Sequence, residues 1–181
     1  MVALLLPAVL VRDRNRWRGA DRFRDAVSEV LWVVTAFTVA HSITLSLAAL
    51  SVVTLPSRLV ESVIALSVAL AAANNLRPVV ARRRWLVALG FGLIHGFGFA
   101  SVLADLGLPS ESLLLSLMGF NLGVELGQLA IVSGFLPLAF LLRRTPFYRR
   151  VVFIGGSLVA LAVSLVWFFE RATGHTIYWP G

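Results

Sequence analysis

VLWVVTAFTVAHSITLSLAALSVVTLPS, residues 30–57, is a run without a charged side chain. A helix needs about 20 apolar residues, at about 1.5 Å each, to cross the hydrocarbon layer of a bilayer, and this run exceeds that length. It also contains His41, an ionisable residue far from both ends of the run. The run therefore predicts a transmembrane helix with a polar group at mid-depth, which is a functional-site hypothesis in membrane proteins.

Similar runs recur along the 181 residues, of which 59% are hydrophobic and only 14% are charged. This composition is far more apolar than that of an ordinary soluble domain. We therefore predict an all-α fold: a single integral membrane domain, residues 1–181, built as a polytopic transmembrane helix bundle with five full spans. The predicted spans are residues 30–54, 59–76, 85–104, 114–140 and 151–169.

The 16 basic residues are all arginines, and 14 of them gather in three predicted loops, residues 12–25, 77–84 and 143–150; the other two are Arg58 and Arg171. Five alternating spans place these loops on one side of the membrane, and the positive-inside rule makes that side cytoplasmic. The loop 105–111, which has no arginine, and the C-terminus then lie on the opposite, extracytoplasmic side. The net charge of +7 is thus expected to face anionic lipid, and no nucleic-acid partner is predicted.

The first 11 residues are apolar but too short to span a membrane, and they lead directly into an arginine cluster. A signal peptide carries its positive charge before the apolar run, so this segment does not fit one. We interpret it as the end of a helix or as a short interfacial helix. A solvated loop with an amphipathic turn around Trp17 and Phe23 is expected to follow.

The first span has a polar face. Thr38, His41 and Thr44 are spaced by three residues, which keeps them within about 120° of one another, and Ser42 lies beside them. These side chains could simply satisfy backbone carbonyls and join helices, or they could form a ligand site. In the second span, small residues lead from Glu61 to Asn75, and Glu61 either reaches interfacial water or belongs to the same site.

The third span contains GFGLIHGFGFA, residues 90–100, in which glycines surround His95. Each glycine costs a helix about 1 kcal/mol relative to alanine, so a compensating role is expected. Gly92 and Gly96 could allow close helix packing, and Gly96 and Gly98 could leave room for a ligand beside the imidazole.

The fourth span has glycines at four-residue spacing: Gly119, Gly123 and Gly127. The opposite face carries two amides and a carboxylate: Asn121, Gln128 and Glu125. We predict a central helix that packs tightly through its glycine face. Burying an unpaired carboxylate in hydrocarbon costs several kcal/mol of free energy. Glu125 is therefore expected to contact His41 and His95, which lie at similar depth.

Two imidazoles, a carboxylate and amides suit a divalent first-row transition-metal ion. The chain contains no cysteine, so a thiolate cannot be one of the ligands. Three other interpretations stay open at this point. The groups could form an intramembrane zinc-type catalytic site, His41 and His95 could be axial ligands of a b-type haem, or the polar residues could only hold the bundle together.

Four ordered motifs together resemble the HupE/UreJ family of bacterial membrane proteins: FTVAHSITL (37–45), VESVIALS (60–67), FGLIHGFGFA (91–100) and FNLGVELGQL (120–129). The resemblance covers roughly residues 4–142. It implies a small permease for nickel or cobalt. Zinc is another candidate ion, and no organic cofactor is predicted. The metal-site residues that it implies are His41, His95, Glu125, Asn121, Gln128 and Glu61, supported by Thr38, Ser42, Thr44, Asn75, Gly96 and Gly98.

The resemblance also implies a multi-pass protein of the bacterial inner membrane, whose partners are the lipid bilayer and a transition-metal ion. A homo-oligomer is an open alternative. Family members usually carry an earlier helix with a Gly-x-Asp-His type of motif, and the first 11 residues match the apolar segment that follows it. We therefore expect part of the family's polar site to be absent from this chain.

Overall fold

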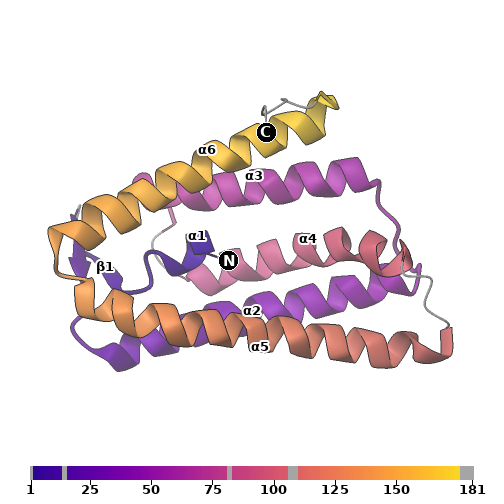
Figure 1. Cartoon of the computed structure of the whole chain (residues 1–181), viewed down its shortest axis with the longest axis horizontal. Coiled ribbons are helices and arrows are strands. Elements are labelled where there is room, and N and C mark those ends of the chain that lie inside the picture. The colour runs from indigo at the N-terminus through magenta and orange to yellow at the C-terminus, as the bar shows by residue number, and fades with distance from the viewer. Residues whose placement is uncertain (1, 14–15, 81–82, 106–109, 176–181) are drawn as a thin grey trace.

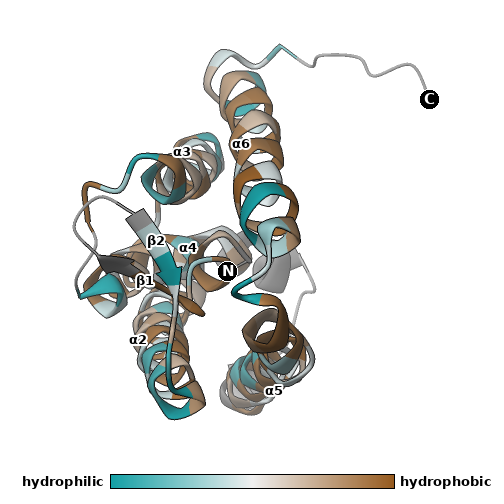
Figure 2. Ribbon diagram, turned by 90° about the vertical axis from the view of Figure 1, so that its left-hand side faces the viewer, coloured by the Kyte–Doolittle hydropathy of each residue, from teal (hydrophilic) through white to brown (hydrophobic). Residues whose placement is uncertain are grey.

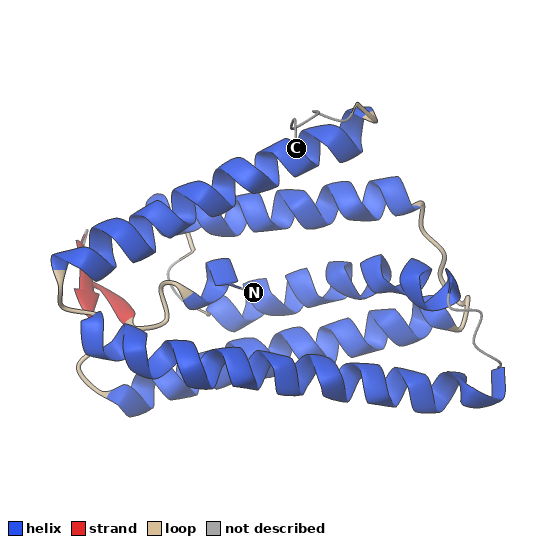
Figure 3. Cartoon of the chain, viewed as in Figure 1, coloured by secondary structure: helices blue, strands red, loops and turns tan. Residues whose placement is uncertain are grey.

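The computed structural model describes residues 2–13, 16–80, 83–105 and 110–175, and five long helices dominate it (Figures 1 and 3). These helices run up and down along one axis, which confirms the predicted all-α membrane bundle. Their bounds are α2, Phe23–Ala49; α3, Ser57–Leu76; α4, Arg84–Asp105; α5, Ser110–Leu142; and α6, Gly156–Thr173, which continues a π-helical segment η1, Tyr148–Gly155.

The helices extend past the apolar runs from which we predicted them. α2 begins at Phe23 rather than near residue 30, because Arg24 and Asp25 lie exposed in its first turns while Ala26 and Val30 are buried. By length and composition, α2, α3, the described part of α5 and the joined η1–α6 segment could each cross a membrane. The described apolar part of α4, Arg84–Phe99, is shorter. Residues 106–109, in the predicted arginine-free loop, lie outside the described residues, as does the end of the chain after residue 175.

The N-terminal segment differs from the predicted loop. A short helix α1, Val2–Leu5, is followed by two antiparallel strands, β1 (Leu10–Asp13) and β2 (Arg16–Gly19). Trp17 therefore lies in a strand and not in an amphipathic helical turn. Leu6 and Val9 are buried against residues of α2 and α5, so this apolar segment fills the interior of the arginine-rich end instead of lying on the surface. Seen from the end of the bundle, α1 lies among the long helices (Figure 2).

The closest helix contact joins α2 and α4, which pack more extensively than any other pair of described elements. A Cβ atom at Gly92 would overlap the backbone carbonyl of Phe37, and one at Gly96 would overlap Thr44 and the carbonyl of His41. The two glycines therefore serve close packing, one of the two roles predicted for them. Gly98 instead faces Ile64 of α3.

The predicted packing of the α5 glycine face is wrong. Nothing lies within 4 Å of a Cβ built at Gly119, Gly123 or Gly127, and all three residues are exposed. α5 packs on α2 through its polar face instead. Polar side chains in a membrane interior gain by pairing with each other, and this pairing determines which face of α5 is buried.

These contacts predict opposite effects for two substitutions in α4. Gly96→Ala should lower the free energy of unfolding by about 1–3 kcal/mol, because its methyl group meets the α2 backbone. Gly90→Ala is the matched control: nothing lies within 4 Å of its Cβ, and alanine is the better helix former. Unfolding of the purified protein in mixed micelles measures both. Equal stability of the two variants would contradict the close α2–α4 contact.

Candidate metal-ion site

His41 lies where three helices meet and is only 2% exposed. Its imidazole stacks on Phe37 and Phe120, with ring centroids 5.9 and 6.4 Å away, and meets the edge of Phe99 at 5.7 Å. The buried Nδ1 atom of His41 makes no hydrogen bond to any residue that the structure describes. A buried polar atom without a hydrogen-bond partner lowers the stability of the fold by about 1–3 kcal/mol. Because a bound ion would supply the missing partner, this nitrogen is a candidate ligand atom.

His95 lies on α4 near His41. Its Nδ1 atom is 2.7 Å from the carbonyl oxygen of Phe91, and its ring meets the edge of Phe37 at 5.4 Å. A carbonyl oxygen only accepts hydrogen bonds, so Nδ1 of the neutral imidazole carries the proton and donates it. The Nε2 lone pair is then free to bind a metal ion, with the ring orientation fixed by the backbone as in many metal sites. Both imidazoles contact the ring of Phe37, so they lie near each other.

The two amides of α5 join it to α2. Ser42 donates a hydrogen bond to Oδ1 of Asn121 at 2.9 Å, and Thr38 donates one to Oε1 of Gln128 at 3.2 Å. The amide nitrogen of Asn121 donates to the carbonyl of Leu117 within α5. The partners of both amides lie within three residues of His41 along α2, and the amides use part of their hydrogen-bonding capacity to hold the two helices together.

Glu125 does not join the two histidines in this structure. It is exposed on α5, and no group of three or more metal-ligating side chains gathers within the described residues. The predicted convergence of Glu125 on His41 and His95 is therefore not observed. On the helical wheel Glu125 lies about 40° from Asn121 and about 60° from Gln128, so it stands just outside the face that contacts α2.

Glu61 lies at the opposite end of the bundle from the arginine clusters and is paired. Its carboxylate is 2.9 Å from Nε of Arg171, which ties α3 to α6. A cavity of about 200 Å³ between α2, α3 and α4 is lined by Glu61, Thr54 and Gly98, among others. The carboxylate is therefore separate from the histidines and lines a small opening between the three helices.

The remaining predicted supporting residues have structural partners. Thr44 donates to the backbone carbonyl of Ala40 within α2. Asn75 is buried and donates to the carbonyl of Ala3 at 2.8 Å and to Ser157 at 3.2 Å, so it joins α3 to α1 and α6. Neither side chain contacts an imidazole, so their roles lie in holding the helices in place.

Sequence reasoning missed the aromatic surroundings of the histidines. Phe37 contacts both imidazoles, and Phe99 and Phe120 contact His41 and each other. Phe37 precedes His41 by four residues, and Phe91 and Phe99 flank His95 by four, so helical spacing was the signal available for them. The partner of Glu61, Arg171, lies 110 positions further along the chain, and no local pattern indicates it.

The long apolar helices define a multi-pass membrane protein of the α-helical class. A family model described as HupE / UreJ protein matches residues 1–171. The chain therefore belongs to the HupE/UreJ family, which confirms the resemblance of the four motifs. The family is known for nickel and cobalt transport, and this agrees in coarse terms with a metal permease. No curated protein and no solved structure gives a significant match.

The Ser42–Asn121 hydrogen bond predicts a measurable coupling between α2 and α5. In a double-mutant cycle of Ser42→Ala and Asn121→Ala, we expect a coupling free energy of about 0.6 kcal/mol and at most about 1.7 kcal/mol, as for other interhelical hydrogen bonds in membranes. Unfolding in mixed micelles measures each variant. Ser133→Ala is a suitable control, since this serine on α5 bonds only within its own helix. Fully additive effects of the first pair would contradict the contact.

Proposed function

We propose that this chain is a membrane permease for a divalent transition-metal ion, with nickel or cobalt as the substrate. The observation that supports this most strongly is the pair of available imidazole nitrogens: Nδ1 of His41, which is buried without a hydrogen-bond partner, and Nε2 of His95, whose lone pair is left free by the bond to Phe91. Neutral imidazole is a good ligand for nickel, cobalt and zinc. Each ring belongs to a different helix, so an ion bound between them would join α2 and α4.

Transport requires binding that is strong enough to attract an ion and weak enough to release it. Two imidazoles with amide oxygens from Asn121 and Gln128 form a neutral donor set, which leaves the charge of the ion uncompensated. A carboxylate would compensate it. Glu125 is the carboxylate at this depth, since the neighbouring α5 residues Asn121 and Gln128 pair with Ser42 and Thr38 next to His41.

We infer that α5 turns about its own axis during the transport cycle. A rotation of about 40–60° would move Glu125 to the face that Asn121 and Gln128 occupy in this structure. The glycine face of α5 is open between Gly119 and Gly127, so few contacts resist a rotation of this part of the helix, whereas Val132, Leu136 and Ala139 are packed in the core and would stay in place. Glu125 would then alternate between the histidines and the outer face of the helix.

The positions of the charges suggest a route. Ions would enter near Glu61 and the opening beside it, reach His41 and His95, and leave toward the arginine-rich end. The positive-inside rule would make that end cytoplasmic and place the C-terminus outside, in an inner membrane. The carboxylate at the entrance attracts cations, and its pairing with Arg171 keeps it from holding them tightly.

An intramembrane zinc-type enzyme remains the second candidate, because two histidines and a carboxylate with an open position also form a catalytic zinc site. Tightly bound, stoichiometric zinc in the purified protein would favour it over a permease. The haem alternative gains no support from the contacts, because α2 fills the space beside Gly92 and Gly96 and phenylalanine rings cover His41.

The permease proposal predicts the behaviour of the three histidine variants. His41→Ala and His95→Ala should each reduce the uptake of radioactive nickel or cobalt by cells by about tenfold or more, since each removes a proposed ligand. His175→Ala is the matched control, because His175 is exposed beyond the end of α6. Equal uptake by His95→Ala and His175→Ala, at equal protein level in the membrane, would contradict the proposal.

Glu125→Gln separates the role of the carboxylate from that of the imidazoles. Glutamine keeps the size of the side chain and one acceptor oxygen but removes its charge, so we expect slower uptake together with retained, weaker binding of the ion to the purified protein. Unchanged uptake by Glu125→Gln would exclude the proposed rotation of α5 while leaving the two-histidine site in place.

A further inference from the structure

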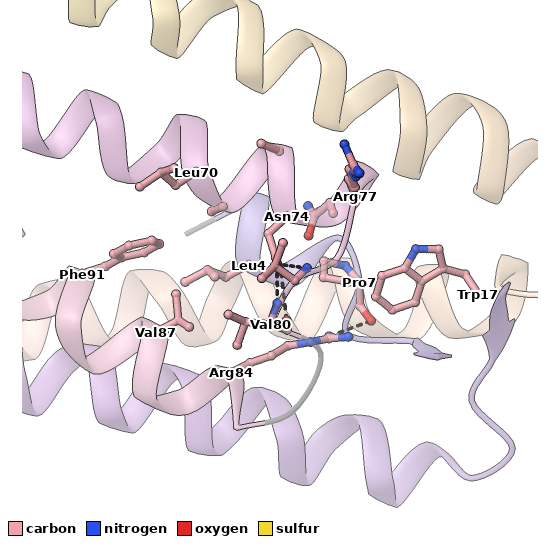
Figure 4. A pocket seen from close by; sticks show the side chains of 14 residues that line it. Leu4, Pro7, Trp17, Leu70, Asn74, Arg77, Val80, Arg84, Val87 and Phe91 are labelled. Carbon is pink, nitrogen blue, oxygen red and sulfur yellow. Dashed lines mark hydrogen bonds between the residues drawn. The ribbon is translucent and has the colours of Figure 1, made fainter. Parts of the chain in front are cut away.

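A second cavity lies at the arginine-rich end of the bundle, away from the histidines. Its volume is about 570 Å³, and it lies between α1, α3 and α4 (Figure 4). This volume is within the range of small-molecule sites in proteins. Neither the metal-ion site nor the proposed route uses it.

The cavity changes character along its length. Leu70, Val87 and Phe91 lie at one end, whereas Arg77 and Trp17 lie at the other (Figure 4). The apolar end is one to two helical turns farther into the bundle than Arg77 and Arg84. The cavity is thus apolar toward the membrane interior and basic toward its surface, which is the polarity of a phospholipid in a bilayer leaflet.

The two arginines at this cavity differ in their partners. Arg84 is engaged, because it pairs with Glu29 at 3.2 Å, donates to the carbonyl of Pro7 at 3.0 Å and lies over the ring of Trp17. Arg77 is exposed, and its guanidinium makes no hydrogen bond or ion pair with any residue that the structure describes. Arg77 is therefore free to bind an anion at the cavity mouth.

Hydrogen bonds hold the rim of the cavity in place, and part of the rim is exposed at the surface of the bundle. Asn74 accepts hydrogen bonds from the backbone N–H groups of Val79 and Val80 at 2.9 and 2.8 Å, and its amide donates to the carbonyl of Val80. These bonds hold the segment after α3 against the cavity. Leu70 and Val79, which also line it, are 56% and 87% exposed, so the cavity communicates with the lipid-facing surface.

We propose that this cavity binds one anionic phospholipid, with an acyl chain between α3 and α4 and the phosphate at Arg77. The apolar walls match the chain, and the unpaired guanidinium matches the phosphate, to which arginine donates two parallel hydrogen bonds. The neighbouring arginine is already neutralised by Glu29, so Arg77 determines the preference for an anionic headgroup. This site is independent of the proposed metal transport.

Native mass spectrometry of the purified full chain tests this with dioleoylphosphatidylglycerol and the zwitterionic dioleoylphosphatidylcholine. We expect one phosphatidylglycerol to be retained in preference to phosphatidylcholine, and Arg77→Gln to weaken that binding about fivefold. Arg150→Gln is the matched control, because Arg150 is exposed at the same end of the bundle but does not line the cavity. Ala73→Leu, which adds volume inside the cavity, should reduce the retention of lipid.

Three results would overturn the proposal. The first is equal retention of the two lipids by the wild-type protein, and the second is an equal loss in Arg77→Gln and Arg150→Gln, which would indicate only a diffuse basic surface. The third is displacement of the lipid by millimolar inorganic phosphate, which would indicate a site for the free anion. Elution of each variant as the wild-type species in size-exclusion chromatography, before the binding measurement, excludes loss of fold as the cause.

Discussion

The close approach of α2 and α4 is the constraint on which the candidate site depends. Gly92 and Gly96 leave no room for side chains, so the backbone of α2 lies directly on α4, and His41 and His95 come to share a contact with Phe37. Any larger residue at Gly96 would separate the helices at the level of the two imidazoles. The same two glycines thus govern both the packing of the bundle and the distance between its proposed ligands.

The packing of α5 contrasts with this rigid pair. Its amides bind Thr38 and Ser42, whereas its glycine face and Glu125 are exposed. A carboxylate that faces hydrocarbon is costly, so an arrangement in which it meets a cation and two imidazoles is strongly favoured over one in which it does not. In the proposed transport cycle, the fixed pair α2 and α4, with α5 turning beside it, would provide the two states that transport needs.

The sequence predicted the five long helices well, because an uncharged apolar run of about 20 residues has few other stable structures. It also predicted that Asn121 and Gln128 share one face of their helix, and both contact α2 in the structure. It could not predict the paired strands β1 and β2, since the apolar residues before them, such as Leu6 and Val9, are buried by tertiary contacts with α2 and α5. The position of Glu125 was equally inaccessible, because wheel angles relate residues within α5 but do not indicate which face α2 contacts.

X-ray absorption spectroscopy of the purified protein loaded with cobalt tests the central claim most directly, because it counts the imidazole ligands of the bound ion. The account predicts a one-to-one complex whose spectrum shows scattering from two imidazole rings and from additional oxygen ligands, and the loss of one ring in His41→Ala and in His95→Ala. A bound cobalt ion with only oxygen ligands, or with the same imidazole count in both variants as in the wild type, would contradict it.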